Sequence, residues 1–145
     1  MEDLQDFLKG KKYKKIKFTV LKTQHLLIKG KINGVKGNFI LDTGASNSCV
    51  GFESVEYFKL NAQFSETKAA GAGATGMETQ LAKNNEIQLG SWKNKQLHLI
   101  VFDMRHVNEA LLQYKTKRVD GIIGADVLLK GKAIIDYCNC CLYLK

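Results

Sequence analysis

The residues of this chain that could do chemistry most directly are one carboxylate and the turn that follows it. The apolar run Phe39–Leu41 leads into Asp42, Thr43, Gly44 and Ala45. A carboxylate fixed in a turn at the end of a buried strand can take a proton from water and act as a general base. Thr43 offers a hydroxyl group, and Gly44 lets backbone amide groups approach the carboxylate without an intervening side chain. An isolated Asp after a strand is usually a turn residue, so the rest of the sequence must supply context.

A second motif lies further along the chain. The segment Val119–Leu129 contains the step Ile122, Ile123, Gly124, two branched apolar residues and a glycine. In this order, Asp-Thr-Gly and then apolar-apolar-Gly, the two motifs resemble those of the retropepsin-like aspartic proteases. The resemblance extends from about His25 to the C-terminus. It implies that the second motif packs beside the catalytic turn. It also implies a mainly β fold, a retropepsin-like closed β-barrel (acid protease fold) with short helices and one lobe per chain.

The same resemblance implies an aspartic endopeptidase that works as a homodimer on a peptide or protein substrate in extended conformation. Only one Asp-Thr-Gly is present, so Asp42 would meet the Asp42 of a partner chain across a twofold axis. Two carboxylates this close share one proton, because both cannot ionise cheaply. The ionised one takes a proton from a water that attacks the scissile carbonyl, and the protonated one donates to the developing oxyanion. Thr43 would bond to its counterpart, Gly44 and Ala45 complete the turn, and neither a metal nor another cofactor is expected.

A glycine-rich segment between the two motifs has three interpretations. Residues 68–77 include Gly71, Ala72, Gly73 and Ala74, and they lie between predicted strands. Such a segment can be a plain loop, a phosphate cradle or a mobile flap. The phosphate cradle is poorly supported, because no Lys-Ser/Thr ending is present and no strand leads through the segment into a helix. By resemblance it is a flap over the substrate, where glycine permits opening and an extended peptide would pair with the flap strands.

Two positions depart from the retroviral members of the group. Those members commonly carry an acidic residue directly after Asp-Thr-Gly-Ala and an arginine after the apolar-apolar-Gly step, and the two form an ion pair. Here the positions hold Ser46 and Ala125. Both ends are missing together, so no charge is left unpaired, but the dimer must be secured in another way. The difference favours a cellular or bacterial member of the group over a viral one.

Other chemically capable side chains have simpler explanations. Three acidic residues suit a turn, a helix start and a strand, and none is followed by Thr-Gly or Ser-Gly: Asp120, Asp126 and Asp136. The histidines lack the H-E-x-x-H spacing of a zinc protease and suit surface or half-buried structural positions: His25, His98 and His106. The cysteines lack paired C-x-x-C spacing, and reduced thiols are expected: Cys49, Cys138, Cys140 and Cys141. No base is marked for Cys49, which predicts a buried core thiol.

The chemistry requires elements that deliver these residues. Leu26–Ile32 and Val35–Leu41 flank Asn33-Gly34, the dipeptide that most readily forms a two-residue hairpin turn. The second strand of this hairpin therefore runs straight into Asp42. Further strands are expected at residues 14–20, 86–89, 97–102, 133–137 and 141–144. Short helices are expected at residues 54–60, 107–114 and 125–130.

Length and composition are those of one ordinary globular domain, with 145 residues of which 45% are hydrophobic. We expect the protease domain at 21–145 and a basic leader or peripheral strand at 1–20. This leader, interpreted as solvated and partly mobile, holds many of the lysines behind the net charge of +8. No apolar stretch approaches the roughly 18 residues of a membrane span, and no secretory signal opens the chain. A cytoplasmic location is expected, or a periplasmic or secreted one if a signal peptide has been removed.

Two rival functions remain at this point. A retropepsin-like fold can serve as a dimerisation or peptide-binding module with little turnover, although the intact Asp-Thr-Gly argues against it. A basic nucleic-acid-binding domain built on Lys9–Lys17 is less favoured, because no recognisable reading motif and few aromatic residues accompany the lysines. A proteolysis assay separates the first rival from the protease, and salt-dependent nucleic-acid binding would support the second.

Overall fold

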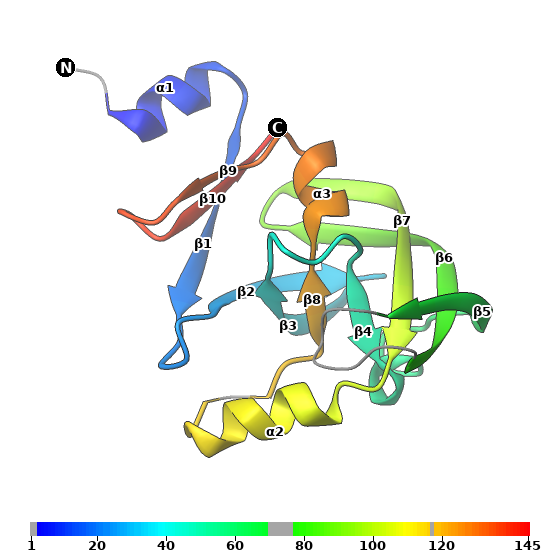
Figure 1. The fold of residues 1–145 in the computed structure, drawn as a ribbon. Helices are drawn as coiled ribbons and strands as arrows, with labels where there is room; N and C mark the ends of the chain where they lie inside the picture. Colours follow the sequence, from blue (N-terminus) through cyan, green and yellow to red (C-terminus); the bar gives the residue numbers. More distant parts are fainter. Residues whose placement is uncertain (1–2, 70–76, 117) are drawn as a thin grey trace.

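A closed six-stranded barrel forms the centre of the molecule, with short helices around it (Figure 1). The computed structural model describes residues 3–69, 77–116 and 118–145, with backbone alone for residues 65–69 and 77. The strands are β1 Lys14–Val20, β2 Leu26–Ile32, β3 Val35–Leu41, β4 Cys49–Gly51, β5 Ala62–Ala69, β6 Met77–Leu89, β7 Trp92–Phe102, β8 Gly121–Ile123, β9 Ile134–Asp136 and β10 Cys141–Leu144. The helices are α1 Leu4–Gly10, the 3₁₀ turn η1 Phe52–Ser54, α2 Arg105–Gln113 and α3 Ala125–Lys130.

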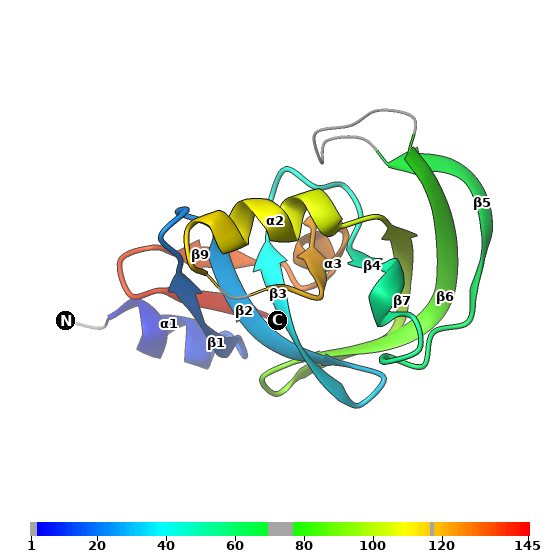
Figure 2. The same ribbon diagram turned by 90° about the horizontal axis from the view of Figure 1, so that it is seen from below.

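The barrel closes because the long strand β6 pairs with β7 along one edge and with β2 near its C-terminal end. The sheet runs β5-β6-β7-β4-β8-β3-β2-β1-β10-β9, and β6 also pairs with β2 through Lys31↔Gln88 and Ile32↔Ile87. This extra pairing joins β2, β3, β8, β4, β7 and β6 into a ring, as the view from below shows (Figure 2). The mainly β fold with a closed barrel and short helices predicted from the sequence is therefore confirmed.

The predicted hairpin places Asp42 at a strand end inside this ring. Asn33 and Gly34 form its turn with φ angles of 51° and 81°, and β2 pairs with β3 in an unbroken register from Ile32↔Val35 to Leu26↔Leu41. On its other side β3 pairs in parallel with β8, where Leu41 lies opposite Ile123. The two sequence motifs, far apart in the chain, therefore lie side by side.

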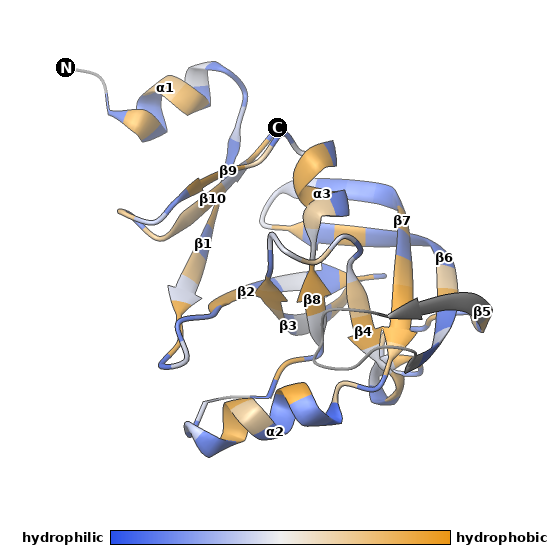
Figure 3. Cartoon of the chain, in the orientation of Figure 1, coloured by the Kyte–Doolittle hydropathy of each residue, from blue (hydrophilic) through white to orange (hydrophobic). Residues whose placement is uncertain are grey.

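The two larger of the three apolar clusters among the described residues fill the barrel and the space beside it. The larger one fills the barrel and includes Phe39, Phe58 and Ile123, all fully buried. The smaller one lies below the end of β3, between the barrel wall and α2, and is formed by Leu27, Ile40, Cys49, Phe102, Met104, Leu111, Val119 and Ile122. Hydropathy colouring shows that β4 and β8 are largely apolar, whereas α2 carries both apolar and polar residues (Figure 3).

The Lys-rich N-terminal segment is part of the fold. β1 pairs with β10 through its first half and with β2 through its second half, so it joins the barrel to the C-terminal hairpin β9–β10. Ile16 and Phe18 point into the core, and Leu8 of α1 packs on Cys141 and Tyr143. The strand predicted at 14–20 is confirmed. Ile16 and Phe18 are buried, whereas the lysines around them stay exposed, so this part of the predicted leader is a strand of the sheet that carries a solvated row of lysines.

One predicted helix is replaced by a tighter turn. Residues 54–60 were expected to be helical, but only the 3₁₀ turn Phe52–Ser54 forms before the chain bends, with Lys59 at φ 58°. The reason is tertiary: Phe58 stacks on Phe39 at 5.9 Å, and the side chain of Asn33 donates to the Phe58 carbonyl at 2.9 Å. These contacts outweigh the local helical preference.

The remaining predicted elements are present. The helices at 107–114 and 125–130 correspond to α2 and α3, and the closing hairpin to β9 and β10. The strands around the turn at Gly90 are longer than predicted, because β6 and β7 pair over most of their length. Within the described residues no helix is long and apolar enough to cross a membrane.

Candidate active site

The turn after β3 holds the carboxylate of Asp42 by backbone hydrogen bonds. The Asp42 amide donates to the Ile123 carbonyl at 2.9 Å, which ties the start of the turn to β8. The Gly44 amide donates to Oδ1 of Asp42 at 2.8 Å, and the Ala45 amide donates to the Asp42 carbonyl at 3.2 Å. A Cβ atom at Gly44 would lie 3.2 Å from that same Oδ1. The amide can therefore reach the carboxylate closely because the position is glycine.

Gly124 lets the second motif pack against this turn. A Cβ atom at Gly124 would lie 2.6 Å from the Ala45 carbonyl oxygen and 3.1 Å from the backbone of Asn47. Both neighbours are backbone atoms, so neither can rotate away. The next residue, Ala125, donates its amide to the Ala45 carbonyl at 2.7 Å. The apolar-apolar-Gly step is therefore in direct contact with the Asp42 turn.

A buried serine joins the Asp42 turn to α3. Ser48 is completely buried, its hydroxyl donates to Oδ1 of Asp126 at 2.7 Å, and its amide donates to Oδ2 at 2.9 Å. The same hydroxyl accepts the Gly124 amide at 2.9 Å, and Asp126 also accepts the Val127 amide at 2.8 Å. Sequence reasoning assigned Asp126 only to the start of a helix and missed this Ser48–Asp126 link. One signal was available in the sequence. Ser46 and Ala125 stand where retroviral members form an ion pair, so another connection between these two segments could be expected.

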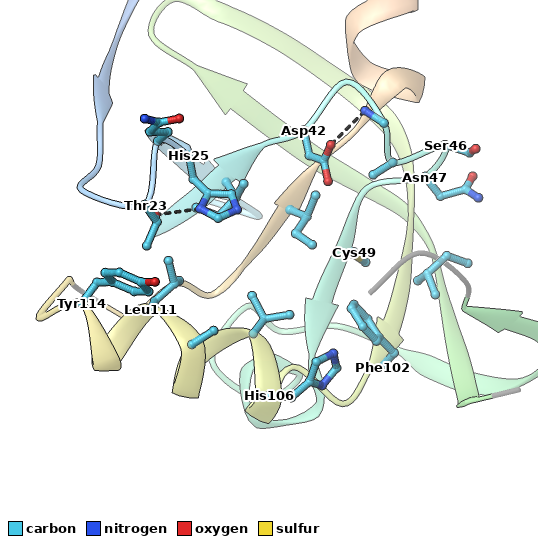
Figure 4. Close-up of a pocket in the computed structure, with 18 of the residues that line it drawn as sticks. Thr23, His25, Asp42, Ser46, Asn47, Cys49, Phe102, His106, Leu111 and Tyr114 are labelled. Carbon is cyan, nitrogen blue, oxygen red and sulfur yellow. Dashed lines mark hydrogen bonds between the residues drawn. The ribbon is translucent and has the colours of Figure 1, made fainter. Parts of the chain in front are cut away.

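Asp42 lies at the rim of a large cleft. The cleft has a volume of about 820 Å³ and is bounded by the Asp42 turn, the loop before β2, strands β4 and β7, and α2 (Figure 4). Its lining comprises Lys22, Thr23, Gln24, His25, Ile40, Asp42, Gly44, Ala45, Ser46, Asn47, Cys49, Ile100, Phe102, His106, Val107, Ala110, Leu111, Tyr114 and Ile122. Among these lining residues Asp42 is the only carboxylate and Lys22 the only lysine or arginine. Asp42 itself is half-buried, so its carboxylate can contact a molecule in the cleft.

The floor of the cleft is apolar and uncharged. It consists of the smaller core cluster, including Ile40, Phe102 and Ile122. Cys49 lies in this floor, and its burial, with the negative charges of Asp126 and Asp42 as further causes, raises the pKa of its thiol to about 12. The thiol is therefore neutral over the physiological pH range. As expected from the sequence, Cys49 is a buried core residue and has none of the features of an activated nucleophile.

Two of the three histidines line the cleft. His25 directly precedes β2, beside the Leu26↔Leu41 pair, and its Nδ1 lies 2.7 Å from Oγ1 of Thr23. His106 is at the start of α2. The sequence predicted surface or half-buried structural positions for both histidines, but it did not predict that they would line the cleft. Their spacing in the chain gave no signal, because the loop before β2 and the helix α2 meet at the cleft only in the folded barrel.

One wall of the cleft is the face of a single helix. Val107, Ala110, Leu111 and Tyr114 line it at spacings of three, four and seven residues, which places them on one side of α2. The helix is held by the side chain of Asn108, which donates to the Val119 carbonyl at 3.2 Å and accepts the Val119 amide at 2.8 Å. Leu111 is buried, whereas Ala110 and Tyr114 are exposed toward the cleft. Sequence reasoning predicted this helix but assigned it no function.

A comparison with protein families agrees with this arrangement. The family model described as aspartyl protease matches residues 28–127, more than two thirds of the chain. The chain belongs to the aspartyl protease family. The matched region includes the Asp42 turn, Ser48, α2 and the apolar-apolar-Gly step.

Several solved structures share the fold, which confirms the retropepsin-like barrel predicted from the sequence. A retropepsin-like aspartic protease from Rickettsia conorii is similar with a TM-score of 0.63 and 18% identity over 91% of each chain. EIAV protease, in a complex with the inhibitor HBY-793, is similar with a TM-score of 0.60 and 20% identity. The match covers 81% of this chain and 98% of the EIAV protease chain. The retroviral protease-like domain of Ddi1 from Leishmania major is similar with a TM-score of 0.58 and 19% identity. The match covers 83% of this chain and 88% of that domain's chain. A comparison with curated protein sequences gives no match.

The structure of this family member brings most of the predicted site residues together. Asp42, Gly44 and Ala45 line the cleft, whereas Thr43 is exposed on the outside of the turn. Ile122 lies in the cleft floor and Ile123 is buried against the barrel core. The predicted flap residues Gly71, Ala72, Gly73 and Ala74 lie outside the described residues, between β5 and β6, which still pair at Ala69↔Met77. Among the described residues, no three His, Cys, Asp or Glu side chains cluster as a metal site would require.

Proposed function

We propose that this chain is an aspartic endopeptidase that acts as a homodimer, with one Asp42 from each copy in a shared active site. One observation supports this most strongly: the carboxylate of Asp42 accepts the Gly44 amide at 2.8 Å at the rim of the 820 Å³ cleft, in a turn held by both sequence motifs. Each chain supplies a single such carboxylate. A site that needs two is therefore incomplete until a second copy is present.

The exposed edge of the turn suits such a pairing. Thr43 is exposed and lies outside the cleft lining, so its hydroxyl group is available to the equivalent residue of a partner. The Ser48–Asp126 link ties the turn to α3 within the chain. This link connects the two segments of one copy close to Ser46 and Ala125, where retroviral members carry their ion pair. The partner therefore has only to meet a turn that is already formed.

In the proposed mechanism, the two copies of Asp42 share one proton because two adjacent negative charges repel each other strongly. The ionised carboxylate removes a proton from a bound water, and the oxygen of that water attacks the scissile carbonyl carbon. The protonated carboxylate donates its proton to the carbonyl oxygen, so the tetrahedral intermediate is formed without a separate negative charge. The Gly44 amide keeps the Asp42 carboxylate oriented throughout.

A cleavage assay with matched variants tests the proposal. Wild-type protein should hydrolyse an unstructured peptide library, and Asp42→Asn should lose activity by about three orders of magnitude or more, because an amide cannot accept the water's proton. The fold should survive, since the Asn oxygen can still accept the Gly44 amide. Asp120→Asn is the control and should remain active, because Asp120 lies outside the cleft lining. Peptide binding without cleavage would instead support a binding module.

A subunit-mixing experiment tests the shared site separately. If equal amounts of wild-type and Asp42→Asn chains exchange partners, the activity per wild-type chain should fall to about half, because half of these chains are then paired with an inactive copy. An active monomer, or an activity that mixing leaves unchanged after complete exchange, would contradict the homodimer.

A further inference from the structure

A surface outside the cleft gathers the lysines of the N-terminal segment and two lysines from the C-terminal end of the chain. All of them are exposed, and together they form the basic surface: Lys9, Lys11, Lys12, Lys14, Lys15, Lys17, Lys132 and Lys145. We propose that this surface, together with the exposed apolar side chains of Leu4 and Phe7 on α1, binds the face of a membrane rich in anionic lipid. None of these residues lines the cleft, so the proposal does not depend on the proposed function.

Tyr13 joins the two ends of the chain at this surface. Its hydroxyl group donates to the Lys132 carbonyl at 2.9 Å. Nζ of Lys145 lies 5.9 Å from the centre of the Tyr13 ring, close enough for a cation–π contact. These contacts bring two lysines from the C-terminal end beside the lysines that surround Tyr13 in the sequence.

The lysines of β1 lie beside α1. Lys15 is opposite Tyr143 of β10, and Leu8 of α1 packs on Tyr143. Opposite residues of paired strands share one face of the sheet, so Lys15 is on the face that carries α1. Nζ of Lys15 also donates to Oε1 of Gln5 in the helix at 2.9 Å. Lys17, two residues further along the strand, is on the same face.

Few negative charges of the chain oppose these lysines. The ion pairs among the described residues use both arginines of the chain and none of the lysines of the basic surface. The described side-chain carboxylates of α1, its cap and β9 are Asp3, Asp6 and Asp136. Asp136 is held locally, because the amide and the side chain of Asn139 donate to it at 3.1 and 2.9 Å. An excess of positive charge is therefore available to a negatively charged partner.

Two apolar side chains of α1 are in contact with water beside these cations. Leu4 is 42% exposed and Phe7 is 49% exposed, and residues three apart are neighbours on a helix surface. Nζ of Lys11 lies 5.5 Å from the centre of the Phe7 ring. An apolar helix edge bordered by lysines is the arrangement with which amphipathic helices lie in the headgroup layer of an anionic membrane.

The composition of the surface favours lipid over nucleic acid. Every cation of the surface is a lysine, whereas the two arginines of the chain lie in ion pairs elsewhere. Lysine is a compact point charge that suits a diffuse layer of headgroups, whereas the planar fork of arginine recognises single phosphates and bases. Leu4 has no ring on which a base could stack, but it would gain from leaving water at the boundary of the acyl chains.

Co-sedimentation with vesicles tests the contribution of charge. Wild-type protein should bind vesicles of phosphatidylcholine and phosphatidylserine at about 7:3 but not vesicles of phosphatidylcholine alone, and salt should weaken the binding. Lys11→Gln/Lys17→Gln should bind about 25-fold more weakly, since each lysine near an anionic surface contributes about fivefold. Lys36→Gln/Lys83→Gln is the control, because it removes the same charge from exposed positions on β3 and β6. It should bind nearly as wild type does.

A fluorescent probe tests whether α1 enters the lipid layer. Emission of Phe7→Trp should shift to shorter wavelength when phosphatidylserine vesicles are added, because the indole leaves water. Phe64→Trp is the matched control. Phe64 is 78% exposed, more than Phe7, and lies on β5, at the end of the molecule away from α1 (Figure 1, Figure 2). The native Trp92 is already buried and should add little to the change.

The outcomes separate the basic surface from a general effect of charge or hydrophobicity. Loss of vesicle binding in Lys11→Gln/Lys17→Gln alone, with a shift for Phe7→Trp alone, supports the proposal. Equal weakening of both double variants, no shift for Phe7→Trp, or an equal shift for Phe64→Trp overturns it. Fluorescence anisotropy with a labelled DNA duplex is measured in parallel. Binding to the duplex that falls in Lys11→Gln/Lys17→Gln, without binding to vesicles, overturns the proposal in favour of a nucleic-acid interface.

Discussion

The Asp42 turn and the α2 wall border the same cleft but are held in very different ways. The turn is fixed by backbone bonds to β8, by direct contact with Gly124 and by the buried Ser48–Asp126 link. Leu111 is the one residue of α2 that is buried. The helix is joined to the segment before β8 by the two hydrogen bonds between the Asn108 side chain and the backbone of Val119. Substitutions that disturb the packing of the turn should therefore affect both catalysis and stability, whereas substitutions of the α2 residues that line the cleft should mainly affect what the cleft binds.

The sharpest way to break the turn is to add one methyl group at Gly124. The Cβ atom of Gly124→Ala would lie 2.6 Å from the Ala45 carbonyl, so the turn or β8 must move. We expect peptide hydrolysis to fall by about 100-fold or more, since displacing a catalytic group by about 1 Å has effects of this size. Gly10→Ala is the matched control, because a Cβ atom there meets nothing within 4 Å. Equal activity of the two variants would contradict the tight contact described above.

Removing the link to α3 should mainly reduce stability. Asp126→Ala deletes the acceptor for the Ser48 amide and hydroxyl and leaves buried donors without a partner. We expect the free energy of unfolding to fall by about 3 kcal/mol, measured by denaturant titration. Asp103→Ala removes an exposed ion pair with Arg105 and the bond from the Arg105 amide, and it should reduce stability much less. A loss for Asp126→Ala as small as that of the control would show that the link contributes little.

Loosening the α2 wall should have a smaller and different effect. Asn108→Ala removes two hydrogen bonds to the backbone of Val119 and should lower the free energy of unfolding by about 1–2 kcal/mol. In the proposed protease, KM should rise several-fold with kcat nearly unchanged, because this wall would contact substrate but not the reacting atoms. Asn94→Ala, which removes an exposed local bond to the Gln96 amide, is the control. A fall in kcat with unchanged KM would place α2 in the chemistry and so contradict the comparison.

The mildest probe is the thiol in the floor that joins the two regions. Burial raises the Cys49 pKa from 9.0 to about 12, so its thiolate fraction near pH 8 is about a thousandfold below that of an ordinary cysteine. A thiol reagent should therefore modify the exposed Cys138 rapidly and Cys49 very slowly, as peptide mapping would show. As the pH rises, the Cys49 thiol ionises in the unfolded state before it ionises in the folded state. The contribution of buried, neutral Cys49 to the free energy of unfolding is therefore complete below pH 9 and is lost as the pH rises toward 12. Rapid labelling of native Cys49 would show that the floor opens readily.

The parts that could be predicted from sequence are those specified by local signals. Asn33-Gly34 fixed the hairpin register, and this register determines where Asp42 emerges. The order of the two motifs indicated the barrel through the resemblance to retropepsin-like proteases, and a helix was predicted at 107–114, where α2 forms. The predicted helix at 54–60 failed because Phe58 finds its partner Phe39 across the barrel, which no local pattern reveals.

The parts that could not be predicted depend on contacts between distant segments. Ser48 and Asp126 are each unremarkable in the sequence and gain a role only because β3 and β8 place the turn beside α3. His25 and the α2 face also line one cleft only because the folded barrel brings these distant segments together. Periodicity predicts that a helix has an apolar side, but it does not show whether that side faces the core or a binding site.

The Ser48–Asp126 link also has a consequence for the order of events during assembly. Because it lies entirely within one chain, the Asp42 turn can form in a monomer, before any partner is met. After dilution from denaturant, tertiary structure should return with first-order kinetics that do not depend on protein concentration. In the proposed homodimer, activity would follow in a second-order step. A newly synthesised copy would then be folded yet silent until its local concentration allowed an encounter, so the rate of synthesis itself would time the onset of proteolysis.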